Sequence, residues 1–439
     1  MTHNEELLQY VWKHKRYNTA HLTTTDGIPI EVIDAGLHNT DAGPDFFNAK
    51  VKIGDKTWAG NIEIHLRADD WEKHRHHTNK AYNSVILHVV ETANKEIFNE
   101  RGERIPQLQL VIPDHVRNNA AYLLHSDSRV ACRHMLPLIP PLFINSFLST
   151  LSLERLERKT SDIFTHLERF NHSWDETFYV MLSRNFGFGL NSDAFEQLAL
   201  SLPFNYIQKH SNSLFQVEAL LFGQAGLLED NIPHDKYYRL LQHEYAFLKS
   251  KYVLKNIDGY LFKNMSVRPQ AFPQVRLAQL AALLQKSGRL FSVVLEKEDY
   301  QALRLHFQAE PSAYWQTHYT LGKESKKSIK LLGDTSLNTL LINTVAPILF
   351  AYGKKMGSEK HCERAIHILE SVKPESNSIV NEFRHAGINP KHAFDTQAII
   401  QLRKEYCDKR KCLYCRIGHA LLSRKTDASS INVEPTSTK

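Results

Sequence analysis

Residues 43–66 read GPDFFNAKVKIGDKTWAGNIEIHL, and this stretch decides the fold of the N-terminal part. Apolar and polar residues alternate on both sides of Gly54-Asp55-Lys56, a pattern typical of two β-strands joined by a turn. We therefore predict a β-hairpin with strands at about 46–53 and 57–66.

The segments around this hairpin extend it into an α/β domain. Leu7, Leu8, Val11 and Trp12 recur at helical spacing and predict an amphipathic helix ahead of the strands. The predicted order is helix, three strands, helix and strand, with one further strand, over about 5–15, 28–35, 46–53, 57–66, 68–77, 84–91 and 107–111. We assign this domain to residues 1–115.

The remainder of the chain has a different pattern. A linker at 116–142 contains three closely spaced prolines, and beyond it Leu, Phe and Ala recur at helical spacing as far as about residue 406. The sequence therefore predicts an α+β protein, in which the small α/β core precedes a large all-helical region. We expect a helical domain at 143–400, a Cys-rich basic module at 401–424 and a disordered Ser/Thr-rich tail at 425–439.

Composition narrows the class of protein. The chain has 439 residues, 42% of them hydrophobic and 23% charged, as in an ordinary globular protein of two or three domains. No apolar run approaches the roughly 18–20 residues that span a membrane, and the polar N-terminal stretch lacks the apolar core of a secretory signal. Five cysteines do not make a disulfide framework, so we expect a cytoplasmic protein with no membrane partner. The net charge of +6 permits a nucleic-acid partner.

Asp45, Glu63 and His65 are the candidate catalytic residues. Glu63 and His65 are two positions apart in one predicted strand, so both side chains project from the same face. Asp45 stands at the start of the neighbouring strand, where its carboxylate can reach that face. Two carboxylates supply the oxygen ligands that Mg²⁺ or Mn²⁺ prefers, and such an ion promotes attack of water on a phosphodiester.

These residues resemble the PD-(D/E)XK nuclease superfamily, in which Pro-Asp and Glu-x-Lys stand on adjacent strands of an α-β-β-β-α-β core. The resemblance covers about 100 of the 439 residues. It implies that Asp45 and Glu63 hold the metal and that Glu5 or Glu6 supplies an additional acid. His65 stands where the superfamily has the lysine that steadies the attacking hydroxide. A neutral histidine there can act as a base or a third ligand, or can mark a site that no longer cleaves. The whole chain also resembles an uncharacterised bacterial family known only as a domain of unknown function.

A purely structural interpretation stays open for the same residues. Asp45 can cap a turn, while Glu63 and His65 form a solvated strand face. Against this interpretation, five histidines fall within 24 positions and favour a polar cleft suited to an anion: His65, His74, His76, His77 and His88.

The second candidate site has the pattern C-x4-C-x2-C-x3-H, with the possible ligands Cys407, Cys412, Cys415 and His419. Four such ligands within 13 residues fit a closed structural Zn²⁺ site. The same cysteine spacing is also found in plant-type iron–sulfur proteins, with Cys132 or Cys362 as a distant fourth ligand. Thiols without any metal are the third possibility.

The cysteine segment is also basic and contains two interleaved tyrosines, Tyr406 and Tyr414. Cations and aromatic rings together favour phosphate contacts and stacking on unpaired bases, although a solvated charged face has the same composition. The candidate nucleic-acid-binding residues are Arg403, Lys404, Lys409, Arg410, Lys411 and Arg416.

From these features we expect a metal-dependent nuclease that acts on DNA or RNA. The alternative is a nucleic-acid-binding or scaffold protein that keeps the nuclease fold without catalysis. A third possibility is a hydrolase for another phosphorylated substrate, which would use the same ligands.

Overall fold

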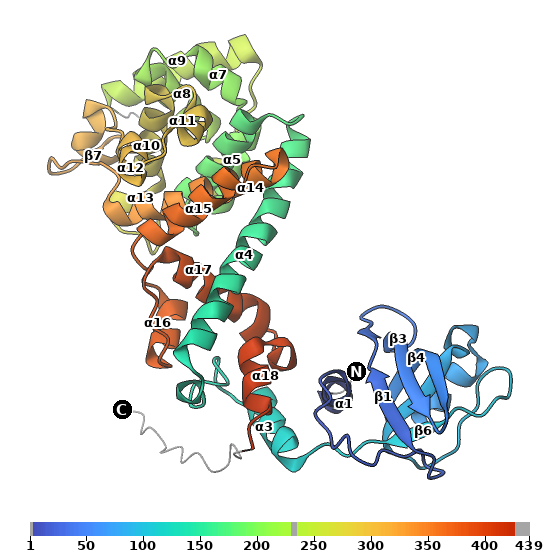
Figure 1. Ribbon diagram of the computed structural model, residues 1–439. Coiled ribbons are helices and arrows are strands. Elements are labelled where there is room, and N and C mark those ends of the chain that lie inside the picture. Colours follow the sequence, from blue (N-terminus) through green and yellow to red (C-terminus); the bar gives the residue numbers. More distant parts are fainter. Residues whose placement is uncertain (1–2, 230–234, 426–439) are drawn as a thin grey trace. The chain divides into compact units, whose positions relative to one another are not determined.

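The computed structural model describes residues 3–229 and 235–425 (Figure 1). Apart from its first residue, the tail predicted at 425–439 lies outside the described residues. The chain forms two compact units, and each contains more than one segment of the sequence. The first unit contains residues 1–147, 377–389 and those from 399 onward; the second contains residues 148–376 and 390–398.

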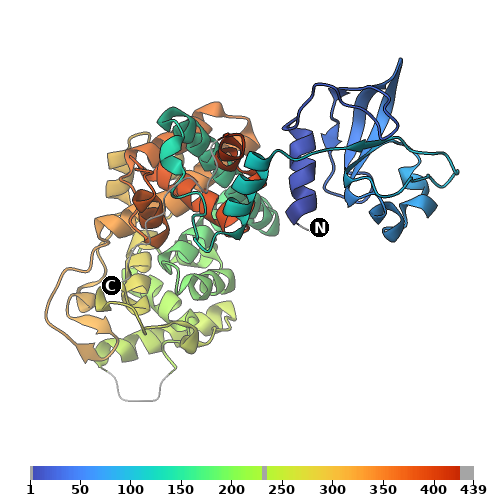
Figure 2. The same ribbon diagram turned by 90° about the horizontal axis from the view of Figure 1, so that it is seen from below.

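A six-stranded mixed sheet lies at the centre of the N-terminal part, with helix α1 beside it in both views (Figures 1 and 2). Its order is β1-β3-β4-β5-β6, and β2 pairs with β3. The pairs β1–β3 and β3–β4 are antiparallel, whereas β5 runs parallel to β4 and β6 parallel to β5. The strands are β1 (Ile30–Asp34), β2 (Leu37–His38), β3 (Phe46–Ile53), β4 (Lys56–Arg67), β5 (Val85–Thr92) and β6 (Gln107–Gln109).

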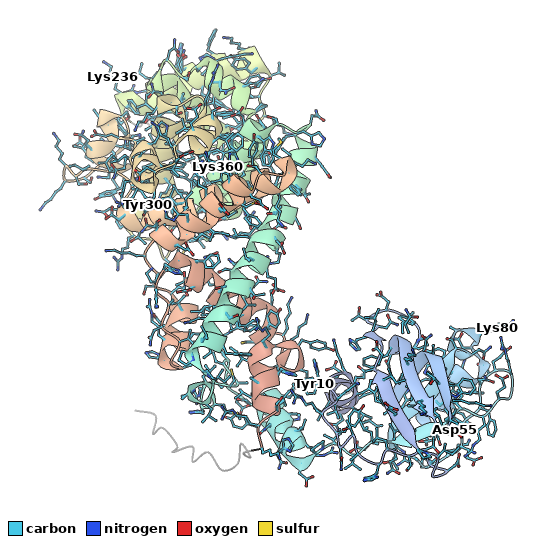
Figure 3. The ribbon with its side chains drawn as sticks, in the orientation of Figure 1. Tyr10, Asp55, Lys80, Lys236, Tyr300 and Lys360 are labelled. Carbon is cyan, nitrogen blue, oxygen red and sulfur yellow. The ribbon has the colours of Figure 1, made fainter. Side chains whose placement is uncertain are left out.

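β3 and β4 form the predicted hairpin. Ile53 pairs with Lys56, so Gly54 and Asp55 make the turn, where Asp55 is labelled in Figure 3. Gly54 has a φ of 59°, a left-handed conformation that glycine adopts without strain. A bulge at Asn48 shifts the register near the start of β3, so the side chains on the N-terminal side of the bulge are oriented differently from those on its C-terminal side.

Two helices contact the sheet, α1 (His3–Lys13) and α2 (Asp70–Lys73), whereas α3 (Asp114–His125) contacts α1 and the C-terminal helix at 416–422. Leu8, Val11 and Trp12 on α1 are fully buried, as their helical spacing predicts. The indole nitrogen of Trp12 donates to the carbonyl oxygen of Ala35, 3.0 Å away, and so fixes α1 against the end of β1. The observed order of helix, antiparallel strands, helix and parallel strand agrees with the predicted order, with β2 as an addition.

The rest of the described chain is dominated by helices, as expected. The core of the second unit is made of apolar side chains with no exposed surface, among them Phe195, Phe222 and Trp315. The helices are α4 (Pro141–Arg169), α5 (Trp174–Phe186), α6 (Ser192–Ser201), α7 (Phe204–Lys209), α8 (Leu214–Gln224), α9 (Lys236–Tyr252), α10 (Pro273–Lys286), α11 (Leu290–Glu296), α12 (Tyr300–His306), α13 (Asp334–Leu340), α14 (Ala346–Met356), α15 (Glu359–Ser371), α16 (Ser378–His385), α17 (Ala393–Gln401) and α18 (Arg416–Leu422).

The helical region is not purely helical, contrary to the prediction. β7 (His318–Thr320) and β8 (Lys323–Glu324) pair as a short antiparallel hairpin within it. Strands of two or three residues are too short to produce a recognisable alternation in the sequence.

One helical run, Asp334–Met356, is long and apolar enough to cross a membrane by length and composition. Of its most apolar window, 72% is buried inside the structure. This burial is the arrangement of a core helix in a folded unit.

Candidate functional site

Asp45 and Glu63 are linked through the main chain of the hairpin. The amide nitrogen of Asp45 donates to Oε2 of Glu63 over 3.1 Å, and the amide of Ile64 donates to Oδ2 of Asp45 over 2.8 Å. The other carboxylate oxygen of Asp45 accepts from Nε2 of Gln9 on α1, 2.9 Å away. We call Asp45 and Glu63 the acidic pair, and α1 and the two strands hold it in one orientation.

Burial governs the electrostatics of the acidic pair. Asp45 and Glu63 are 7% and 5% exposed. Burial raises the pKa of Asp45 to about 8, and the nearby Glu63 carboxylate adds to this rise. Burial likewise raises the pKa of Glu63 to about 8. Two buried carboxylates of this kind favour either a proton or a cation between them.

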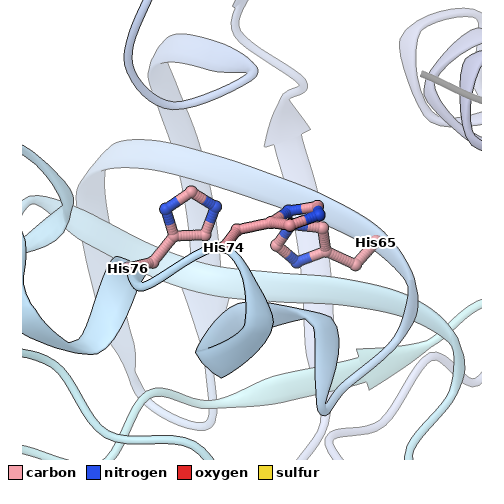
Figure 4. Close-up of side chains that lie close together, drawn as sticks. All are labelled: His65, His74 and His76. Atoms are coloured by element: carbon pink, nitrogen blue, oxygen red, sulfur yellow. The ribbon is translucent and has the colours of Figure 1, made fainter.

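His65, His74 and His76 form a group beside the acidic pair, called the histidine group below (Figure 4). One ligand atom from each ring lies within 4.8 Å of the others. Oε1 of Glu63 lies 3.6 Å from Nε2 of His65 and 3.3 Å from Nε2 of His76. The arrangement combines imidazole nitrogens with a carboxylate oxygen, a donor set that suits Mn²⁺, Zn²⁺ or Fe²⁺.

A chain of hydrogen bonds through His88 and Gln107 fixes the ring of His65. Its Nδ1 lies 2.9 Å from Nε2 of His88 on β5, and Nδ1 of His88 faces Nε2 of Gln107 at 3.5 Å. The amide of Gln107 also donates to the carbonyl oxygen of Lys95, so its nitrogen side faces His88. This relay assigns the proton between the two rings to His88 and leaves the proton of neutral His65 on Nε2, where it points towards Glu63 and His74.

The buried rings of this site stay uncharged at neutral pH. Burial, together with a smaller contribution from His88, lowers the pKa of His65 to about 2. Burial also lowers the pKa of His88 to about 3 and that of His76 to about 4. His88 lies among apolar residues of β5, where a buried polar ring needs a hydrogen-bond partner, and His65 is that partner.

A cavity of about 510 Å³ opens onto the acidic pair and the histidine group. Glu5 on α1 lines it, and its carboxylate interacts electrostatically with both members of the acidic pair. Tyr82 forms part of the wall and stacks on His76 with ring centroids 3.8 Å apart. Of the two acids left open by the sequence, Glu5 therefore lies at this cavity, whereas Glu6 lines a different one.

That second cavity, of about 340 Å³, lies on the other side of α1. It is lined by cationic and aromatic side chains, including Lys13, His14, Tyr414 and Arg416. Gln9, which binds Asp45, lines it as well, so the two cavities share α1 as a wall. Of the residues with proposed phosphate contacts, Arg416 lies here.

The structure brings the three C-terminal cysteines together with Cys132. All four line one small cavity of about 20 Å³, and no disulfide joins them. Burial raises the pKa of Cys132 well above its usual value, and each of the other three thiols adds to the rise, so they lie within electrostatic reach. We call Cys132, Cys407, Cys412 and Cys415 the four-cysteine cluster. Cys362 instead lies on α15 in the second unit, where its thiol donates to the carbonyl oxygen of Phe350.

His419 is not among the residues around that small cavity. Its ring contacts α1 and the residues that follow it: Nδ1 lies 2.9 Å from the hydroxyl of Tyr10, and Nε2 lies 3.1 Å from Nη2 of Arg16. Both ring nitrogens therefore have partners other than the thiols. Tyr10 is labelled in Figure 3.

The six basic residues of the module differ in their surroundings. Arg403 is buried and forms ion pairs with Glu382 and Asp408, and Arg410 donates to the carbonyl oxygen of Ser128. Lys409 pairs with Glu405 on the surface at 2.5 Å. The remaining three residues are exposed: Lys404, Lys411 and Arg416.

Sequence reasoning did not single out Gln9 as a partner of Asp45, nor His74 and His76 as ligands beside Glu63. The pattern His74-Arg-His76-His77 was visible, but which of its rings turn inwards depends on the short turns between β4 and β5. Gln9 gave no signal, because it is one polar residue in an amphipathic helix.

A family model described as "Protein of unknown function (DUF2851)" matches residues 5–378. The match extends from α1 to the start of α16 and confirms the resemblance to an uncharacterised family. No curated protein and no solved structure matches the chain. The family's description states no activity.

Proposed function

The chain belongs to the family described as protein of unknown function (DUF2851), and from this premise we propose that it hydrolyses phosphodiester bonds in DNA or RNA with the help of a divalent cation. The observation that carries the proposal is the acidic pair at an open cavity. Two carboxylates, each more than nine-tenths buried, face a space of about 510 Å³ that is also lined by histidines. Buried acids that face a cavity are common at catalytic sites.

The donor atoms at the cavity fit a divalent cation. Asp45 and Glu63 would hold it through oxygen, and His76 through nitrogen, since Nε2 of His76 is 3.3 Å from Oε1 of Glu63. Glu5 supplies further negative charge from α1. A bound divalent ion lowers the pKa of water and neutralises charge on a phosphodiester.

His65 takes the place that lysine has in the PD-(D/E)XK nucleases. Its relay through His88 leaves an N–H directed at the cavity, and a neutral ring can donate this proton to an oxygen of the substrate or of the attacking water. Lysine also donates from this position, so the chemical role is retained with a neutral group. Gln9 is a positioning residue at the acidic pair, because its side-chain amide donates to Asp45.

Two structural features support a polymeric, anionic substrate. The element order of the N-terminal part is α1-β1-β2-β3-β4-α2-β5-β6, which contains the α-β-β-β-α-β order of the PD-(D/E)XK nucleases together with two additional strands, β2 and β6. Beside the acidic site, the cavity of about 340 Å³ presents Lys13, Arg416 and the ring of Tyr414. Cations with an aromatic ring suit a phosphate backbone and an unpaired base.

The proposal is tested by incubating end-labelled DNA and RNA with the full chain in Mn²⁺, Mg²⁺ or EDTA. Cleavage that needs the metal and is lost in Asp45→Asn and in Glu63→Gln supports it. Both substitutions keep an oxygen that accepts from the neighbouring amide, so the hairpin is retained.

Two other outcomes contradict the proposal. Tight binding of nucleic acid without cleavage in any of these metals would indicate the non-catalytic alternative. Release of phosphate from small phosphorylated compounds, without binding of either polymer, would indicate a hydrolase of another substrate class.

A further inference from the structure

The four-cysteine cluster brings two distant parts of the chain together. Cys132 lies in the segment between α3 and α4, whereas the other three cysteines follow α17. Hydrogen bonds hold the segments against each other: Nη1 of Arg410 donates to the carbonyl oxygen of Ser128, 282 positions away, and Sγ of Cys412 donates to that of Leu123. The cluster therefore depends on the tertiary fold and not only on the local spacing of the three C-terminal cysteines.

The backbone around the cysteines is shaped for this arrangement. α17 continues into a π-helical turn, Leu402–Cys407, which ends at the first of the three cysteines. Such turns are rare and recur at functional sites. Gly418 approaches the Cys412 turn so closely that a Cβ atom there would lie 2.0 Å from the carbonyl oxygen of Cys412. Around the thiols lie mostly apolar residues, including Leu402 and Ile417.

A single zinc ion and a larger centre place different demands on the spacing of four thiols. A zinc ion holds four thiolates at about 2.3 Å in a tetrahedron, which puts any two sulfurs about 3.8 Å apart. Among the residues that the structure describes, the histidine group is the only set of three or more Cys, His, Asp or Glu side chains with all ligand atoms within 4.8 Å. No three sulfurs of the four-cysteine cluster are therefore close enough to share one zinc ion without moving.

Thiols whose sulfur atoms lie further apart can instead bind a cluster of several metal and sulfide ions. In an iron–sulfur cluster, iron and sulfide ions stand between the cysteine ligands, and four cysteines are the usual complement. We propose that an iron–sulfur cluster is bound by the four thiols of Cys132, Cys407, Cys412 and Cys415. It would tie the segment before α4 to the segment after α17.

The experiment measures iron, zinc and acid-labile sulfide in full-length protein purified without oxygen, together with the visible absorption spectrum. We expect iron and sulfide in equal amounts and a broad visible band that bleaches on reduction. A single zinc ion per chain without sulfide, or protein with neither metal, would overturn the assignment. The native protein alone decides this outcome, so it does not depend on whether a variant folds.

Three variants identify the ligands. Cys132→Ser should lose the iron, whereas Cys362→Ser, the matched change of the remaining cysteine, should retain it. His419→Ala should also retain the iron, since the ring binds Tyr10 and Arg16. Retention of iron by Cys132→Ser together with its loss from His419→Ala would refute the four-cysteine assignment in favour of the local pattern.

The inference does not depend on the proposed nuclease activity. The double variant Asp45→Asn/Glu63→Gln should carry the same amount of iron and sulfide as the native chain. Absence of cleavage with an intact cluster would refute only the proposed function, and cleavage without iron would refute only the cluster.

Discussion

The main-chain amide of Asp45 donates to the carboxylate of Glu63, so the two acids that face the cavity are joined without direct contact between their carboxylates. The link is reciprocal, since Asp45 accepts from the amide of the residue after Glu63. Each carboxylate keeps an oxygen that is not used by this link: Oε1 of Glu63 faces the histidine group, and Oδ1 of Asp45 faces Gln9. The pair is thus rigid enough to define a site.

Removing either charge should abolish catalysis while the fold is retained. For Asp45→Asn or Glu63→Gln we expect the rate of cleavage to fall by roughly 10²–10⁴-fold, because proton transfer and cation binding both fail. Asp55→Asn is the control, since this acid is exposed in the turn of the same hairpin. Equal rates in all three variants, measured on labelled DNA and RNA, would remove the acidic pair from the mechanism.

The metal-free protein should become less stable as the pH rises from about 6.5 to 8. The pKa of both acids of the pair is raised to about 8 in the folded state. In this pH window the folded chain therefore still binds protons that the unfolded chain has released, and a rise in pH favours the unfolded state. Each carboxyl contributes a slope of up to about 1.4 kcal/mol per pH unit. The buried histidines do not oppose it in this window, because they are neutral in both states above pH 6.5.

This pH dependence is measured by thermal unfolding in EDTA. Below about pH 6.5 the slope should reverse, because the three histidines His65, His76 and His88, whose pKa values are lowered, then outweigh the two acids and make the folded state less stable as the pH falls. In the double variant of the acidic pair, the decline between pH 6.5 and 8 should disappear. Addition of Mn²⁺ at pH 8 should raise the midpoint of the native protein but leave that of the double variant unchanged.

The histidine group should set the preference among metals. Imidazole binds Mn²⁺ and Zn²⁺ more readily than Mg²⁺, so His76→Ala should weaken activation by Mn²⁺ more than activation by Mg²⁺, about tenfold or more. His77→Ala is the matched control, because this neighbouring ring is exposed. Metal titrations of cleavage measure the effect, and an identical shift for both metals would mean that His76 is not a ligand.

The basic residues of the C-terminal module should fall into two classes. The double variant Lys404→Glu/Lys411→Glu should bind nucleic acid more weakly and with a weaker dependence on salt. For duplex DNA, the slope of log K against log salt concentration should fall by about 0.9 for each phosphate that the protein no longer neutralises. Arg403→Ala should instead lower the midpoint of thermal unfolding, because it removes the buried guanidinium that pairs with both Glu382 and Asp408. A salt slope that is unchanged in the double lysine variant would exclude this face from binding.

Gly418→Ala should disrupt the cysteine segment. The added Cβ would meet the carbonyl oxygen of Cys412 at 2.0 Å, and backbone cannot yield as a flexible side chain does. We expect the free energy of unfolding to fall by about 1–3 kcal/mol and the metal content to fall with it. Gly288→Ala is the control, because the nearest atom to its Cβ would be 4.0 Å away. Normal metal content in Gly418→Ala would show that the turn tolerates displacement.

The sequence predicted local structure better than distant neighbours. Alternation along 46–67 identified the hairpin and placed Glu63 and His65 on one face, since strand periodicity is a local property. It did not pair Asp45 with Gln9, 36 positions away, or His419 with Tyr10, 409 positions away. Such contacts depend on how whole elements pack, and a single polar residue leaves no periodic trace.

The cysteine pattern illustrates the same limit. The spacing of Cys407, Cys412 and Cys415 indicated a metal site, because three soft ligands stand close together in the sequence. The fourth partner remained open among His419, Cys132 and Cys362. The structure places Cys132 with the three thiols, and only tertiary packing distinguishes it from Cys362.

The division of the first unit among separated segments has a consequence for biosynthesis. A ribosome completes Cys132 long before it begins the segment at residue 399 that carries the other three thiols. During that interval the sheet of the nascent chain can already form, while Cys132 is not yet covered by the segment that carries the other three cysteines. The first unit can therefore be completed only after the ribosome has made its C-terminal segments.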